Sequence, residues 1–134
     1  MIVVDTNLIA YLLIDGDQTG SAEKVLLKDE HWVSPLLWRS EFRNTLVKCI
    51  RTGLLSLDAA FRIMSEAESL MAGYEYAVVS GDVLSLAGSS SCSAYDAEFV
   101  ALARDLGFPL VTTDKLLLES FPDTAVSPAR FLAC

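Results

Sequence analysis

The first stretch of the chain, residues 2–7 with the sequence Ile-Val-Val-Asp-Thr-Asn, decides the fold. Three β-branched residues in a row predict a short strand that is buried in a parallel sheet, and Asp5 follows it directly. A second apolar run, residues 110–113, leads into Asp114 in the same way. Because open α/β sheets place their ligand sites at the carboxyl ends of strands, we predict that both acids lie in one pocket. A shared acidic pocket points first to a metal ion.

Length and composition predict a single domain spanning residues 1–134. The chain is 52% hydrophobic and 21% charged, which excludes a disordered polar segment. No apolar stretch approaches the roughly 20 residues of a membrane-spanning helix, and the N-terminus shows no basic segment followed by an apolar one. We therefore expect a cytoplasmic protein with no membrane association.

The cysteines and the single histidine argue against several kinds of site. Cys49, Cys92 and Cys134 are odd in number, widely spaced and outside any CxxC pair, so they predict neither a disulfide framework nor a zinc site. His31 has no second histidine with which to build a metal site or a triad. Acid–base chemistry would therefore depend on carboxylates or on bound water.

Apolar periodicity and turn signals predict alternating strands and helices along the whole chain. The expected strands are residues 2–4, 32–33, 76–79, 110–113 and 125–126. The expected helices are a short one through residues 11–13, then residues 21–29, 35–51, 56–72, 81–88, 93–106 and 115–120. Strands separated by helices predict right-handed crossovers and an α/β fold, with a mostly parallel sheet covered on both sides.

Four acids are candidate metal ligands, and each has a structural alternative. Asp5 and Asp114 each lie between a strand and a helix, where either could instead cap the helix N-terminus. Asp96 lies three residues after Ser93 in a capping-box pattern, but its helix is apolar almost all round, and a buried carboxylate needs a compensating charge. Glu41 lies at the border of an apolar helix face, where pairing with nearby arginines is the alternative.

Taken as a set, the four acids indicate Mg²⁺ chemistry. Hard divalent cations prefer oxygen ligands, usually a few carboxylates together with water and substrate phosphates. Such an ion binds a scissile phosphate and turns its bound water into a nucleophile. This chemistry needs neither histidine nor cysteine, which suits the composition of the chain.

The formal net charge of −8 argues against strong affinity for nucleic acids, which usually comes from lysine and arginine. Basic residues nevertheless concentrate between positions 39 and 51, where Glu41 alone opposes them. Arg39 and Arg43, one helical turn apart, are our candidates for RNA phosphate contacts. A solvated helix face is the alternative explanation of this cluster.

Four motifs of the chain resemble those of the PIN-domain ribonucleases. They are residues 3–7 (VVDTN), 40–42 (SEF), 95–103 (YDAEFVALA) and 111–114 (VTTD). Size and organisation are similar to the VapC-type toxins of type II toxin–antitoxin pairs, and the resemblance covers nearly the whole chain. It implies a PIN-like three-layer α/β/α sandwich with an acidic pocket at one edge of a mostly parallel sheet.

The resemblance also implies an activity and its residues. The acidic quartet that binds Mg²⁺ or Mn²⁺ and carries catalysis would be Asp5, Glu41, Asp96 and Asp114. Thr6 and Thr113 would be polar supports, Asn7 would fix the first loop, and Glu98 is a lesser candidate. The implied reaction is metal-dependent endonucleolytic hydrolysis of single-stranded or looped RNA, with metal-bound water as the nucleophile. The implied partners are a second copy of the chain and a cognate antitoxin.

Two other functions remain open at this point. A phosphoacceptor signalling domain also places aspartates at strand ends with Mg²⁺, but it normally has adjacent acids after its first strand. Here a single acid precedes Thr6, and Lys115 follows Asp114 directly. The second alternative is a non-catalytic PIN fold that only binds other proteins, and the presence of all four acids gives it little support.

Overall fold

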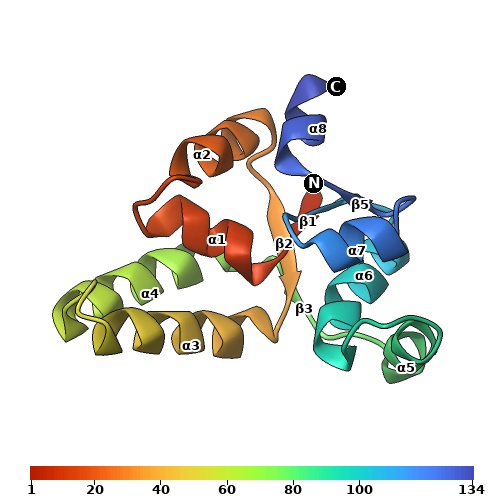
Figure 1. The fold of residues 1–134 in the computed structure, drawn as a ribbon, viewed down its shortest axis with the longest axis horizontal. Coiled ribbons are helices and arrows are strands. Elements are labelled where there is room, and N and C mark those ends of the chain that lie inside the picture. Colours follow the sequence, from red (N-terminus) through yellow and green to blue (C-terminus); the bar gives the residue numbers. More distant parts are fainter.

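The computed structural model describes all 134 residues and contains five strands in one sheet (Figure 1). Every neighbouring pair is parallel, and the order across the sheet is β3-β2-β1-β4-β5. The strands are β1 (Ile2–Val4), β2 (Trp32–Pro35), β3 (Glu75–Tyr76), β4 (Leu110–Val111) and β5 (Ala125–Val126). The predicted parallel α/β architecture is confirmed.

Helices cover both faces of the sheet and complete a three-layer sandwich (Figure 1). One face carries α1 (Thr6–Leu13), α2 (Thr19–Lys28), α3 (Trp38–Arg51), α4 (Leu57–Met71) and α8 (Pro128–Ala133). The other face carries α5 (Ser80–Gly88), α6 (Ala94–Leu106) and α7 (Lys115–Ser120). None of these helices combines the length and the hydropathy that crossing a membrane requires.

The central strand β1 contributes side chains to two hydrophobic cores, one on each face of the sheet, which explains why all of its residues are apolar. Successive side chains of a strand point to opposite faces of the sheet. Ile2 and Val4 pack with Trp38 in the core beneath α1–α4, and Val3 packs with Phe99 in the core beneath α6. All three residues of β1 are at most 1% exposed.

The register of the sheet brings two segments from opposite ends of the chain to the same point. Val4 of β1 pairs with Val111 of β4, and both strands end there. The residues that follow, Asp5 and Thr112, therefore emerge side by side at the carboxyl edge of the sheet. This is the edge at which parallel α/β folds build their sites.

The helix predicted from Pro35 begins later, at Trp38, because Pro35 is the last residue of β2. In the observed register the carbonyl of Val4 faces position 35, and a proline there has no N–H to donate. The Ser34 hydroxyl donates to that carbonyl instead, at 2.6 Å. The Ser34 side chain thus replaces the missing backbone hydrogen bond between β1 and β2 at the point where these two strands end.

Two further predictions were wrong in extent. The strand expected over residues 76–79 is limited to β3, and the strand expected over residues 110–113 is limited to β4. Helix α8 was not predicted at all, although Ser127 before Pro128 is a typical helix start. The Ser127 hydroxyl accepts from the Arg130 amide at 3.2 Å, which caps this short helix.

Candidate active site

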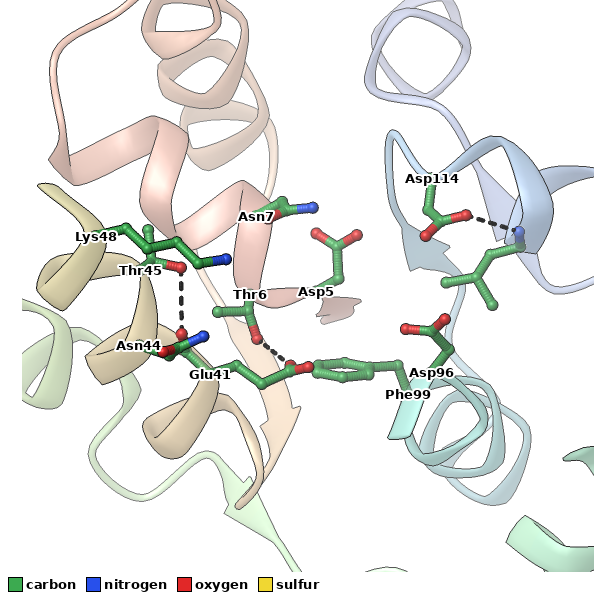
Figure 2. Close-up of a pocket in the computed structure, with 11 residues that line it drawn as sticks. Asp5, Thr6, Asn7, Glu41, Asn44, Thr45, Lys48, Asp96, Phe99 and Asp114 are labelled. Atoms are coloured by element: carbon green, nitrogen blue, oxygen red, sulfur yellow. Dashed lines mark hydrogen bonds between the residues drawn. The ribbon is translucent and has the colours of Figure 1, made fainter. Parts of the chain in front are cut away.

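A cavity of about 200 Å³ opens at the carboxyl edge of the sheet. Its wall contains six of the residues predicted from the sequence, which are Asp5, Thr6, Asn7, Glu41, Asp96 and Asp114. Figure 2 shows them converging from two sides, with Glu41 and Thr6 facing Asp96 and Asp114, and Asp5 between them. Residues more than 100 positions apart in the chain therefore share one acidic cavity.

Asp5 both caps α1 and lines the cavity. Its Oδ1 accepts from the Leu8 amide at 3.0 Å, and its Oδ2 accepts a short hydrogen bond from the Thr112 hydroxyl. The side chain is only 7% exposed. Burial raises the pKa of Asp5 from its ordinary 3.8 to about 6, and the charges of Asp114 and Glu41 add to the effect. A buried carboxylate in this state favours the approach of a proton or a cation.

Glu41 lies in the first turn of α3 and reaches across to α1. Its Oε1 accepts from the Thr6 hydroxyl at 2.7 Å, and this bond fixes the carboxylate in the cavity (Figure 2). Partial burial raises the pKa of Glu41, and the negative charge of Asp96 opposite raises it further. The alternative of pairing with neighbouring arginines is wrong, because Glu41 makes no ion pair.

Asp96 and Asp114 come from the opposite wall, and they are held differently. Asp114 Oδ1 accepts from the amides of Leu116 and Leu117 at 2.9 and 3.2 Å, so Asp114 caps α7. Asp96 lies in the first turn of α6, where Ser93 provides the cap instead. Burial raises the pKa of Asp96, and the charge of Asp114 adds to that rise.

Thr112 links the two strand-end acids, whereas the sequence predicts the supporting role for Thr113. The Thr112 hydroxyl donates to Asp5 and accepts from the Asp114 amide at 3.0 Å. Thr113 lies outside the cavity wall, and its hydroxyl is 3.3 Å from that of Tyr11. Thr112 is fully buried behind the cavity wall, so it acts by holding Asp5 and the start of the Asp114 turn in place.

Three polar residues of α3 line the cavity and were not among the predicted site residues. They are Asn44, Thr45 and Lys48. They follow Glu41 at spacings of three, four and seven residues, which places all four on one face of a helix. This spacing was visible in the sequence once Glu41 was chosen as a site residue.

The arginines proposed for RNA contact lie elsewhere. The Arg39 guanidinium donates to Glu75 through Nε and Nη2, and Nη1 donates to Glu68 at 3.2 Å. Arg43 is exposed, and it is not part of the cavity wall. Glu98 is also outside the wall, although burial and the nearby charge of Glu41 raise its pKa. The prediction of a phosphate contact for Arg39 is at odds with its pairing to carboxylates.

The donor set suits a hard divalent cation. All four acidic side chains and the neighbouring Thr6 and Asn7 offer oxygen ligands, and Asp5 is buried without a positive partner. No three acids lie close enough together to form a compact protein cage for an ion. Mg²⁺ usually keeps several waters and takes only one or two carboxylates directly, so spaced carboxylates fit its requirements.

Comparison with known proteins identifies the family. The family model of the PIN domain matches residues 2–120. The chain belongs to the PIN-domain family. This PIN domain is 33% identical to Ribonuclease VapC3 of Pyrobaculum aerophilum over 124 residues, which cover 90% of this chain and 95% of that relative.

Solved structures share the PIN fold at lower sequence identity. The crystal structure of PAE2754 from Pyrobaculum aerophilum superimposes with a TM-score of 0.77 at 23% identity, covering 98% of this chain and 86% of that one. A chain of a toxin–antitoxin complex from Klebsiella pneumoniae gives 0.66 at 16% identity, covering 96% and 98%. At these identities the two structures support the fold that the strand order describes.

Proposed function

We propose that this protein is a metal-dependent endoribonuclease that hydrolyses RNA phosphodiester bonds and acts as the toxin of a toxin–antitoxin pair. The observation that carries the proposal is the cavity, in which four carboxylates face one another: two from α3 and α6, and two from the residues that cap α1 and α7. The similarity to a relative named a ribonuclease supports the choice of substrate. We treat residues 1–134 as one nuclease domain.

The proposed metal is Mg²⁺ or Mn²⁺, held by Asp5, Asp96 and Asp114, with Glu41 binding it directly or through water. A bound ion of this kind neutralises phosphate charge and makes water a better nucleophile. The residues around it keep the carboxylates in place: Thr112 and the Leu8 amide hold Asp5, and Thr6 holds Glu41. Fixed ligands of this sort reduce the reorganisation needed when the substrate binds.

The proposed partners are an antitoxin and a second copy of the chain. The structural relative from Klebsiella pneumoniae is described as a toxin–antitoxin complex, which supports an antitoxin partner for this PIN domain. We place the protein in the cytoplasm, and its three free cysteines, one of them buried, suit a reducing compartment.

The test is cleavage of a labelled single-stranded RNA by the purified chain with Mg²⁺ or Mn²⁺, and again with EDTA. We expect cleavage only with the divalent ion, and we expect Asp5→Asn to be inactive while remaining folded. Asp17→Asn is the matched control, because Asp17 is exposed in the turn before α2 and is not part of the cavity wall. Cleavage that survives EDTA, or an Asp5→Asn variant as active as Asp17→Asn, would contradict the proposal.

A further inference from the structure

Lys48 is the single basic residue in the wall of the carboxylate cavity. It is exposed on α3, and it takes part in no ion pair. Figure 2 shows its side chain extending from α3 over Thr45, on the same side of the cavity as Glu41 and Asn44. A free ammonium group beside four carboxylates is therefore available to a ligand.

The neighbouring arginines of α3 do not line the cavity. Arg39, on the same helix, is bound to Glu75 and Glu68. Arg43 and Arg51 are exposed on α3, and neither is part of the cavity wall. Because the cavity is otherwise acidic, a polyanion that enters it meets repulsion everywhere except near Lys48 and near any bound cation.

Lys48 lies two helical turns after Glu41 on α3. Seven residues separate it from Glu41, which corresponds to about 10 Å along the helix axis. This backbone spacing leaves room for one phosphate group at the carboxylates and for a second one within reach of the Lys48 side chain. Asn44 lies between Glu41 and Lys48 and adds an amide that can donate to a phosphate oxygen.

We infer that Lys48, assisted by Asn44, binds a backbone phosphate of the RNA strand that neighbours the phosphate being cleaved. This inference rests on the proposed function, and it assigns RNA positioning to α3 through a residue different from Arg39 and Arg43. Lysine suits the role because a compact ammonium group binds phosphate as a point charge without needing one fixed geometry. Such a contact would set the direction in which the strand crosses the cavity.

The test measures binding of a short fluorescein-labelled single-stranded oligoribonucleotide in the Asp96→Asn background, which keeps the RNA intact. We expect Lys48→Ala to weaken binding about tenfold at low salt. We also expect the slope of log K against log salt concentration to fall by about 0.7, the value for one lost phosphate contact on a single strand. Lys48→Arg should retain most of the affinity.

Lys24→Ala is the matched control, because Lys24 is an exposed lysine of α2 that is not part of the cavity wall. In the otherwise wild-type chain, Lys48→Ala should raise KM more than it lowers kcat. A melting temperature equal to that of the parent would show that the effect is local, and Lys48→Gln provides a second variant if alanine destabilises the helix.

The outcomes separate this inference from the proposed function. Unchanged affinity and salt slope in both Lys48→Ala and Lys48→Gln would overturn the role of Lys48, even if the wild-type chain cleaves RNA. Normal binding with no cleavage by the wild-type chain would contradict the proposed function, and the salt slopes would still decide the role of Lys48. Absence of RNA binding by every form would contradict both.

Discussion

The two acids at strand ends and the two acids on helices are held in different ways. Asp5 and Asp114 each accept backbone amides at a helix N-terminus, and Thr112 joins them to each other. Glu41 and Asp96 accept no backbone amide, and their helices begin without their help. The strand-end acids therefore cap helices in addition to the proposed chemistry, whereas the helix acids cap none.

The largest expected effect lies on the helix acids. Glu41→Gln should lower RNA cleavage by about 10³-fold, since loss of one metal-binding carboxylate removes several kcal/mol of transition-state stabilisation. Its stability should stay equal to wild type or rise, because the change removes a half-buried charge with a raised pKa. Cleavage assays and thermal melting of the same preparation check both parts. A large loss of stability would show that Glu41 has a structural task as well.

The second largest expected effect is a change with pH in the unfolding free energy of the chain, measured without divalent ions. The folded pKa of Asp5, about 6, lies above its ordinary 3.8, so between these values the folded state binds more protons than the unfolded state. The unfolding free energy contributed by this group is therefore highest below about pH 4 and falls by roughly 3 kcal/mol as pH rises past 6. Urea unfolding at a series of pH values measures it.

Asp5→Asn is the control for this pH effect, because an amide does not titrate. We expect the fall in stability between pH 4 and 7 to shrink by most of that amount in the variant. A saturating concentration of Mn²⁺ should also reduce the fall in the wild-type chain, since a cation compensates the buried charge. An identical pH profile in wild type and variant would show that Asp5 does not carry the effect.

A smaller effect is expected at the residue that joins the two strand-end acids. Thr112→Val keeps the side-chain shape and removes the hydroxyl, which leaves Asp5 Oδ2 and the Asp114 amide without a partner. We expect a loss of about 1–3 kcal/mol in stability and of about 10–100-fold in cleavage. Thr113→Val is the matched control and should change both much less. Equal effects of the two variants would contradict the claim that the Thr112 hydroxyl holds Asp5 and the Asp114 amide in place.

The smallest expected effect is a difference in stability between a variant that loses a helix cap and one that does not. Asp114→Ala should destabilise the chain by about 1 kcal/mol through the lost cap of α7. Asp96→Ala should not show this loss, because Ser93 caps α6. Chemical denaturation resolves a difference of this size. A larger loss in Asp96→Ala than in Asp114→Ala would reverse the comparison between the strand-end and helix acids.

Parts of the site could be predicted because they depend on local sequence. A short apolar run that ends in an acid places that acid at the edge of a sheet, and this was enough to identify Asp5 and Asp114. Glu41 and Asp96 could be found because a carboxylate on the border of an apolar helix face needs a reason to be there. Capping and cavity lining were alternatives for Asp5 and Asp114, and the structure shows both.

Other parts could not be predicted because they depend on long-range register and pairing. The choice between Thr112 and Thr113 depends on which hydroxyl the chain after β4 brings to Asp5. The engagement of Arg39 depends on Glu75, which lies 36 residues away and is brought near by β3. Pro35 extends β2 because it pairs with Tyr76 of β3, where the Leu36 amide donates to the Tyr76 carbonyl at 3.1 Å. Helix α8 is short, and it packs on α2, where Lys28 donates to the Cys134 carbonyl at 2.7 Å.

The most direct test of the central claim compares Asp96→Asn with Asp17→Asn in Mn²⁺-dependent cleavage of one labelled single-stranded RNA. Asp96 has no capping task, so its loss tests the acidic set without disturbing the fold. We predict that Asp17→Asn cleaves like the wild-type chain and that Asp96→Asn, with an unchanged melting temperature, does not cleave. Cleavage by Asp96→Asn at the wild-type rate would contradict the claim that the four carboxylates act as one metal-dependent catalytic set.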